Sequence, residues 1–142
     1  MNNIPDGFTK SPRKSPLTDP WEPIHWKLSE RGAVLGLEVR EAHCNARGFA
    51  HGGLIAALSD NAMGSSLVLK ARKKFENDSL SAVTLSMTTD YIDIARIGDW
   101  LEFRPNVLKV GRSIGFTELK VIATRDGEER TIARSNASFK LV

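Results

Sequence analysis

The stretch that decides the fold is residues 45–70, N-A-R-G-F-A-H-G-G-L-I-A-A-L-S-D-N-A-M-G-S-S-L-V-L-K. From Gly52 to about Lys70 it contains no proline and many good helix formers, which predicts a long helix. Two sides of this helix are apolar, one with Leu54, Ile55, Leu58 and Ala62, the other with Ala56, Met63 and Leu67. We expect its own sheet to cover one side, and another element or a partner subunit to cover the other.

A single carboxylate, Asp60, interrupts the second apolar side between Ala56 and Met63. Burying an unpaired charge is costly, so an acid on such a face needs a reason. A partner lysine or arginine could neutralise it. A carboxylate in a partly apolar cleft is also a better general base or nucleophile than one in water, which makes Asp60 a candidate catalytic residue.

The start of the helix offers a second chemical feature. Its first N–H groups have no intrahelical partner, and Gly52 and Gly53 have no side chain to keep a ligand from the backbone. Such an end can stabilise the oxyanion of an acyl-transfer reaction, although two glycines can also serve close packing alone. Asp60 lies about two turns further along, so either the reacting carbonyl lies beside the helix or the carboxylate comes from an opposing subunit.

Neighbouring polar residues could complete such a site. Asn45 could fix a water molecule or orient the carboxylate, or its amide could bond its own loop backbone. Thr84 or Ser86 could hydrogen-bond from a facing strand, and His51 could donate to a carbonyl or simply cap the loop. We expect no metal site, because the adjacent His43 and Cys44 do not have a familiar ligand spacing. Side chains that could shape an acyl pocket are Phe49, Met63, Leu67 and Trp100.

Strands are expected on both sides of the helix in sequence. Alternation of apolar and polar residues predicts strands at 33–40, 80–91, 99–110, 113–124 and 131–141. Hairpin turns are expected at G-R-S 111–113 and at Asp126-Gly127. The order of strand, long helix and four antiparallel strands predicts an α+β fold in which a curved antiparallel sheet wraps around one helix. One such layer leaves the helix half covered, so we expect at least a dimer.

Composition sets the frame for this fold. A chain of 142 residues suits one domain, at residues 21–142, and four of the six prolines fall within residues 1–20, which predicts a flexible or loosely docked arm. The net charge of +3 is mild and the basic residues are scattered, which argues against nucleic acid. No apolar run is long enough for a membrane span, the N-terminus lacks the apolar core of a secretory signal, and a lone cysteine forms no internal disulfide. We expect a cytoplasmic protein.

The pattern N-x-x-G-x-x-H-G-G, followed seven residues after its last glycine by aspartate, resembles the signature of hotdog-fold acyl-CoA thioesterases of the PaaI-like group. Its residues here are Asn45, Gly48, His51, Gly52, Gly53 and Asp60, and the resemblance extends over residues 31–142. It implies a hotdog fold, a homodimer with two active sites at the subunit interface and often a dimer of dimers. It also implies hydrolysis of an acyl-CoA thioester, with coenzyme A as part of the substrate and no further cofactor.

The resemblance also implies a role for each matching residue. Asp60 would act as nucleophile or general base, and the amide of Gly52 or Gly53 would polarise the thioester carbonyl. Asn45 would position water or the thioester, and Thr84 would assist from the partner chain. Arg112 and Ser113, in the G-R-S turn, match the place where this group meets the phosphates of coenzyme A. From the residues alone, Arg112 is only a solvated charge.

Two other functions remain open. A non-catalytic acyl-CoA sensor on the same fold would keep the pocket but would not need Asp60. A hotdog dehydratase or hydratase needs a histidine and an acid arranged to move protons on the acyl chain, and the double glycine with a downstream aspartate fits hydrolysis better. Release of free thiol distinguishes hydrolysis from both.

Overall fold

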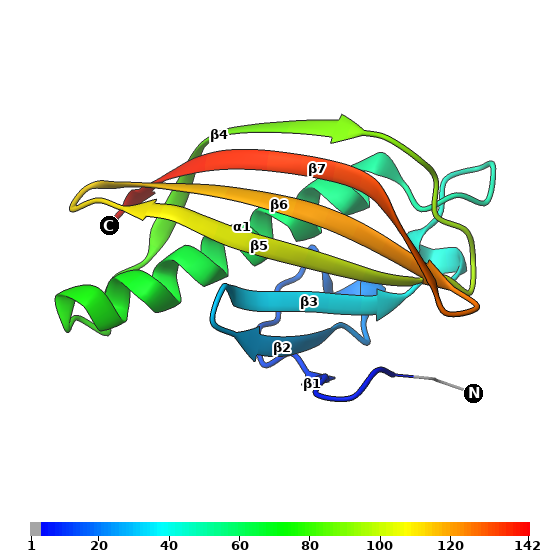
Figure 1. Ribbon diagram of the computed structural model, residues 1–142, viewed down its shortest axis with the longest axis horizontal. Coiled ribbons are helices and arrows are strands. Elements are labelled where there is room, and N and C mark those ends of the chain that lie inside the picture. Colours follow the sequence, from blue (N-terminus) through cyan, green and yellow to red (C-terminus); the bar gives the residue numbers. More distant parts are fainter. Residues whose placement is uncertain (1–3) are drawn as a thin grey trace.

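The computed structural model describes residues 4–142 and consists of one long helix lying against a single antiparallel sheet (Figure 1). The strands are β1 (Thr9–Lys10), β2 (His25–Ser29), β3 (Gly32–Glu38), β4 (Ala82–Tyr91), β5 (Trp100–Val110), β6 (Ile114–Arg125) and β7 (Glu128–Leu141), the helix is α1 (Gly52–Phe75), and short 3-10 turns lie at Asp19–Trp21 and Glu41–His43. The predicted α+β fold, with a curved sheet around one helix, is confirmed.

The sheet order is β1-β2-β3-β5-β6-β7-β4, with all neighbouring strands antiparallel. The five predicted strands correspond to β3, β4, β5, β6 and β7, while β1 and β2 were not predicted. The Asp126-Gly127 turn is confirmed, with φ values of 52° and 80° that suit a tight hairpin. β4 does not pair with β5, which follows it in sequence, but with β7, so it forms one edge of the sheet (Figure 1).

The helix begins at Gly52 as predicted but ends at Phe75 rather than near Lys70. The additional turn continues the apolar side, because Ala71 is fully buried and Phe75 packs against the core. The positive charges of the basic side chains in the last turn interact favourably with the negative end of the helix dipole and stabilise the helix. The helix stops at Glu76, whose φ of 48° is left-handed.

The core lies between α1 and the sheet. Helix residues Leu54, Ile55, Leu58, Ala62, Met63 and Leu67 are buried there, with Leu37, Phe103, Val121 and Ile132 among their strand partners. Met63 and Leu67 are fully buried, and Trp100 belongs to a second small cluster with Phe8 and Val34. The expectation that Met63, Leu67 and Trp100 shape an acyl pocket is therefore wrong within one chain, because core packing already occupies their surfaces.

The N-terminal segment is docked on the sheet across residues 4–20, and residues 1–3 of the predicted arm lie outside the described residues. β1 pairs with β2, and Phe8 is buried edge-on against Trp100 with ring centroids 5.3 Å apart. Of the two alternatives expected for this arm, flexible or docked, the structure shows docking, and the Phe8 side chain supplies the apolar contact that the proline-rich composition concealed. It also explains why β3, predicted to be half-buried, is buried on both faces, Val34 included.

The loop between β4 and β5 supports the segment that leads into α1. The N–H of Ala50 donates to the carbonyl of Ala95 at 2.9 Å, and Phe49 forms an isolated bridge with Arg96. The guanidinium of Arg96 also lies over the Phe49 ring, 5.1 Å from its centroid. These contacts fix the position of the backbone that leads into the helix at Gly52.

Asp99 holds that loop in place. Its carboxylate is fully buried and accepts hydrogen bonds from Arg125 at 2.5 Å and from Arg130 at 3.0 Å. Burial alone would raise the pKa of Asp99, but the bonds from the Arg96 N–H, Arg130 and Arg125 outweigh burial and lower this pKa below its ordinary value. The buried charge is fully paired, as the energetics of burial require.

Candidate functional site

Strand β4 lies along α1 and contacts it through two hydrogen bonds. Thr84 Oγ1 donates to Asp60 Oδ1 at 2.6 Å, and the Tyr91 hydroxyl donates to the carbonyl of Gly52 at 2.7 Å. One strand therefore touches both the predicted catalytic acid and the predicted oxyanion site. The hydroxyl partner of Asp60 is Thr84 and not Ser86, because a β-bulge between Thr84 and Ser86 shifts the register of β4.

Asp60 lies at the border between the core and a groove. It is half-buried, whereas Met63 on the next turn is completely buried. Beside it is a cavity of about 110 Å³, lined by Arg13, Asp60, Asn61, Gly64, Ser65, Val68, Ser81, Ala82, Thr84 and Phe139. Thr84 binds only Oδ1, which leaves Oδ2 of Asp60 directed to no partner in residues 4–142. The carboxylate is oriented by its threonine and accessible from the cavity.

At the start of α1, His51 is the N-cap residue. Its Nδ1 accepts the Gly53 N–H at 2.8 Å, so the proton of the neutral ring is on Nε2, and the side chain is exposed. The Gly53 amide is thus engaged in capping. Within the described residues, the N–H groups of Gly52 and Leu54 have no acceptor. Of the two glycine amides predicted as oxyanion donors, Gly52 is the free one.

Asn45 organises the loop ahead of the helix. Its Oδ1 accepts N–H bonds from Arg47 at 2.9 Å and Phe49 at 3.2 Å, as in the structural alternative raised from the sequence. The Nδ2 group has no partner in the part of the chain that the structure describes. Asn45 can therefore hold its loop with the oxygen and still donate to a water or a carbonyl with the nitrogen.

The two halves of the predicted site do not meet in one chain. Gly52 and Asp60 are eight residues apart on one helix, which separates them by about 12 Å along its axis. His51, Gly52 and Asn45 form one group at the helix start, and Asp60 with Thr84 forms another. A second copy of the chain, or a long substrate lying along the groove, is needed to bring the two groups to one reacting carbon.

The predicted phosphate-binding residues lie in the turn between β5 and β6, at the end of the sheet near the helix C-terminus. Lys74 of α1 donates to the carbonyl of Val110 there at 2.8 Å, and Ser113 Oγ accepts from Lys140 at 3.2 Å. Arg112 is exposed, with no hydrogen-bond partner in residues 4–142. In one chain the structure does not bring this turn together with Asn45 or Gly52.

His43 has a structural role that its place beside Cys44 in the sequence does not indicate. It is buried, its Nδ1 accepts the Arg40 N–H at 3.0 Å, and its Nε2 donates to the carbonyl of Trp21 at 2.9 Å. Its own carbonyl accepts the His51 N–H at 2.8 Å. Burial lowers the pKa of His43, which keeps the ring neutral. His43 therefore connects the N-terminal segment to the residue that caps α1.

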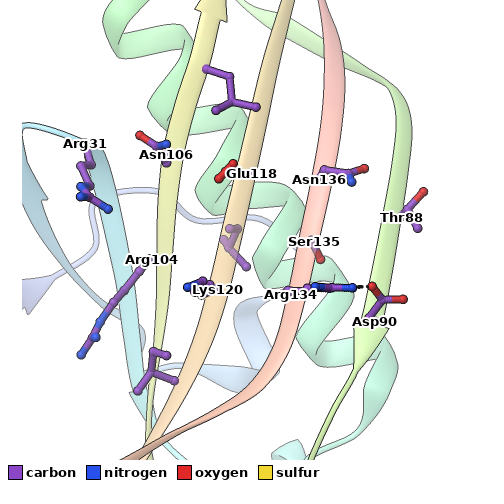
Figure 2. Close-up of a pocket in the computed structure, with 13 residues that line it drawn as sticks. Arg31, Thr88, Asp90, Arg104, Asn106, Glu118, Lys120, Arg134, Ser135 and Asn136 are labelled. Atoms are coloured by element: carbon purple, nitrogen blue, oxygen red, sulfur yellow. Dashed lines mark hydrogen bonds and ion pairs between the residues drawn. The ribbon is translucent and has the colours of Figure 1, made fainter.

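A cavity larger than the one beside Asp60 lies elsewhere. It has a volume of about 660 Å³ and lies on the face of the sheet turned away from α1 (Figure 2). Its lining is polar and charged, with Arg104, Lys120, Arg134 and Glu118 from the central strands and an ion pair between Arg134 and Asp90 at 2.9 Å. None of the predicted site residues lines it. We place the candidate site in the smaller groove because Asp60 and Thr84 line it.

Comparison with known proteins identifies the family of the chain. The family model described as Thioesterase superfamily matches residues 47–129. The chain is 32% identical to Putative esterase PA0474 of Pseudomonas aeruginosa over 99% of both chains. It is 30% identical to human Acyl-coenzyme A thioesterase 13 over 67% of this chain and 64% of that protein. The chain therefore covers less than two thirds of the length of human Acyl-coenzyme A thioesterase 13.

Solved structures share the fold. A thioesterase family protein from Silicibacter pomeroyi superposes with a TM-score of 0.76 at 23% identity, covering 90% of each chain. A hypothetical thioesterase from Streptococcus pneumoniae, solved with coenzyme A, gives 0.71 at 20% identity over 86% of this chain and 90% of that one. A mutant of phenylacetic acid degradation protein PaaI from Thermus thermophilus gives 0.70 at 24% identity over 89% and 98%. These likenesses confirm the hotdog fold.

Proposed function

The chain belongs to the thioesterase superfamily, and we propose that this thioester hydrolase acts on an acyl-CoA, with Asp60 as the catalytic carboxylate. The observation that carries the proposal is the 2.6 Å hydrogen bond from Thr84 to Asp60 beside a cavity on α1. A carboxylate oriented by a hydroxyl, and open to a cavity on its other oxygen, is placed to act on a carbonyl carbon or on a water next to it. Acyl-coenzyme A thioesterase 13 is a relative whose name gives the same reaction class.

Hydrolysis follows from these groups in two alternative ways. As general base, Asp60 takes a proton from water while the hydroxide oxygen bonds to the thioester carbon. As nucleophile, its oxygen bonds to that carbon first, and water then cleaves the resulting anhydride. In both cases the carbon–sulfur bond breaks, the thiolate of CoA leaves and is protonated, and the acid is released. The Gly52 N–H binds the carbonyl oxygen as negative charge develops on it.

We propose that the working site forms between two copies of the chain. The outer edge of β4 has no partner strand in the described residues, and Val83 and Leu85 on it are 55% and 52% exposed. A two-fold axis next to this edge would pair β4 with its equivalent and place the Gly52 group of one copy near Asp60 of the other. The same chain could then associate further as a dimer of dimers. No cofactor is needed, since CoA is part of the substrate.

The remaining residues have supporting roles. The Nδ2–H group of Asn45 would donate a hydrogen bond to water or to the thioester, and Arg112 and Ser113 would bind the CoA phosphates from their exposed turn. The crystal structures of the Streptococcus pneumoniae relative include variants with one aspartate or one threonine changed to alanine, the same residue types as the Asp60–Thr84 pair. The dehydratase alternative is less well supported, because His51 uses Nδ1 to cap the helix about two turns from Asp60.

The test is release of free thiol from short, medium, long and aryl acyl-CoA substrates by the native protein, Asp60→Ala and Asp60→Asn. We expect both variants to lose at least about 100-fold in kcat while keeping the native melting temperature and oligomeric state, since they remove the reacting group and little else. Native-like hydrolysis by both variants would eliminate Asp60 as the catalytic group. Binding of acyl-CoA without any thiol release by the native protein would favour the sensor.

A further inference from the structure

The N-terminal segment carries a guanidinium into the Asp60 groove. Arg13 Nη1 donates to Ser65 Oγ at 2.7 Å, and Arg13 lines the same cavity as Asp60 and Thr84. Ser65 is buried on α1, 52 residues further along the chain. Arg13 lies outside residues 47–129, the part matched by the family model, so the shared family pattern does not account for it.

The segment fixes where this side chain points. Ser11, two residues earlier, is buried, donates its N–H to the carbonyl of Ile24 at 2.9 Å, and accepts the Arg13 N–H on its hydroxyl at 3.3 Å. Together with Phe8 under Trp100, these contacts anchor the backbone before Arg13. The guanidinium is therefore placed in advance and is not selected from a mobile tail.

Most of the guanidinium's hydrogen-bonding capacity is unused. It has five N–H donors, and the bond to Ser65 uses one. No carboxylate of residues 4–142 is within ion-pair distance of Arg13, including Asp60, which lines the same cavity. A planar cation with free donors next to a reaction centre is suited to a carboxylate or phosphate oxygen, which it can bind through two parallel bonds.

The space around Arg13 favours a small ligand group. On the side away from Asp60 the groove continues into a second cavity of about 240 Å³, lined by Arg13, Trp26, Ser65, Val68, Leu69, Arg72 and Ser81. Its wall is apolar at Trp26, Val68 and Leu69, and a second guanidinium, Arg72, lies at its rim and donates to the carbonyl of Leu80 at 2.8 Å. A short hydrocarbon chain ending in a negative group matches this lining.

We propose that Arg13 is a specificity-determining residue that binds a carboxylate carried by the acyl group of the substrate. The inference rests on the proposed function, in which the thioester carbon lies at Asp60. The pantetheine arm separates the phosphates of CoA from the thioester by many bonds, so a group bound within the same cavity as Asp60 belongs to the acyl side. The substrates are then CoA thioesters of short dicarboxylic acids.

The experiment compares glutaryl-CoA with pentanoyl-CoA, which has a methyl group where glutaryl-CoA has its carboxylate. The native protein should have the higher kcat/KM for glutaryl-CoA. Arg13→Ala should lower kcat/KM for glutaryl-CoA about tenfold, the loss expected for a charge-assisted hydrogen bond. The same substitution should change kcat/KM for pentanoyl-CoA by less than about twofold. Arg13→Lys should restore part of the preference for glutaryl-CoA over pentanoyl-CoA. The control Lys14→Ala removes a charge from the next residue and should leave kcat/KM for both substrates unchanged.

One further substrate separates the two sources of anionic oxygen. The N-acetylcysteamine thioester of glutarate has the acyl carboxylate but no phosphates, and the Arg13→Ala loss should persist with it. Loss of the effect would assign Arg13 to a CoA phosphate and overturn the proposal, as would equal losses on glutaryl-CoA and pentanoyl-CoA.

Failure of the proposed function is distinguishable from failure of this inference. If the native protein released no thiol from any substrate, hydrolysis would be excluded, and calorimetric Kd values for glutaryl-CoA and pentanoyl-CoA would still test Arg13. Tighter binding of glutaryl-CoA that disappears in Arg13→Ala supports the assignment. Equal Kd values for the two ligands overturn it.

Discussion

At the scale of single residues, the contact between Thr84 and Asp60 has the most direct bearing on chemistry. The hydroxyl fixes one carboxylate oxygen and leaves the other facing the cavity. The residues alone leave Thr84 and Ser86 as alternatives, and the family resemblance selects Thr84. The β-bulge between them decides the matter, and a bulge has no clear signal in a run of alternating residues.

Thr84→Val should lower kcat for thioester hydrolysis about tenfold, because an isosteric apolar side chain no longer orients the carboxylate. Thr84→Ser should stay within about threefold of native, since it keeps the hydroxyl. Steady-state thiol release with melting temperatures for both variants checks this. Ser86→Ala is the matched control on the same strand, and an equal loss there would show that the effect is not specific to the Asp60 contact.

Asp99 is the residue on which the loop before β5 depends. Asp99→Ala leaves Arg125 and Arg130 without their buried partner, and we expect the free energy of unfolding to fall by about 3 kcal/mol. Glu129→Ala removes the exposed partner of Arg104 and should cost less than about 1 kcal/mol. Denaturant titration of the two variants measures the contrast. Similar losses would mean that burial of Asp99 does not set the strength of its ion pairs.

At the scale of elements, the start of α1 combines a structural and a chemical role. His51 caps the helix through the Gly53 amide, and the amide of Gly52 stays free for a ligand. The glycine pair has a steric reason as well. A Cβ at Gly53 would lie 3.0 Å from His51 Nδ1, so a side chain there would disturb the cap.

Substitution of His51 can separate its two roles. His51→Ala should lower the free energy of unfolding by about 1 kcal/mol through loss of the cap, whereas His51→Asn keeps a capping oxygen and should be nearly native in stability. If the imidazole also contacts the thioester, His51→Asn will lose activity without losing stability. Thermal unfolding beside kcat/KM distinguishes the cases, and full activity in His51→Asn would reduce His51 to a cap.

At the scale of the whole molecule, the free edge of β4 and the divided site are the two features on which the proposed dimer rests. Val83 and Leu85 supply apolar surface at that edge, and β4 contacts both halves of the site, at Asp60 through Thr84 and at Gly52 through Tyr91. None of the helices in residues 4–142 has the length and apolarity needed to cross a bilayer. The expected cytoplasmic location stays a prediction.

If the proposed dimer forms through β4, Val83→Lys should convert it to a monomer and abolish thiol release together, because an edge lysine opposes strand pairing and the half-sites then separate. Leu28→Lys changes an equally exposed leucine, 59% accessible on β2, and should leave both properties intact. Light scattering coupled to gel filtration, with activity on the same fractions, tests this. A fully active monomer would refute the shared site.

Acid should destabilise the protein through its buried histidines. Burial lowers the pKa of His43 and of His25 below 6.5, so the unfolded state takes up protons at a higher pH than the folded state does. Their contribution is complete above about pH 6.5 and is lost as the pH falls below it. His43→Gln should flatten the decline between about pH 6.5 and 5 in denaturant titrations. An unchanged slope would assign the decline to other groups.

Local sequence patterns were enough to predict the helix start, the five main strands, the hairpin turn at Asp126-Gly127 and the presence of a carboxylate on a face expected to be buried. These depend on local periodicity, on capping and on backbone conformations that each short segment carries with it. The C-terminal end of the helix was predicted too early, near Lys70. Phe75 continues the apolar side of the helix, but the lysines before it make this part of the sequence resemble a polar turn.

Tertiary structure alone decided the features that depend on partners distant in the chain. These are the pairing of β4 with β7, the docking of Phe8 under Trp100, the role of His43 and the placement of Arg13 beside Asp60. Each arises from a contact between segments whose own composition suggests something else, such as a proline-rich arm. Periodicity reports which side of a segment is buried, but only the folded chain shows what buries it.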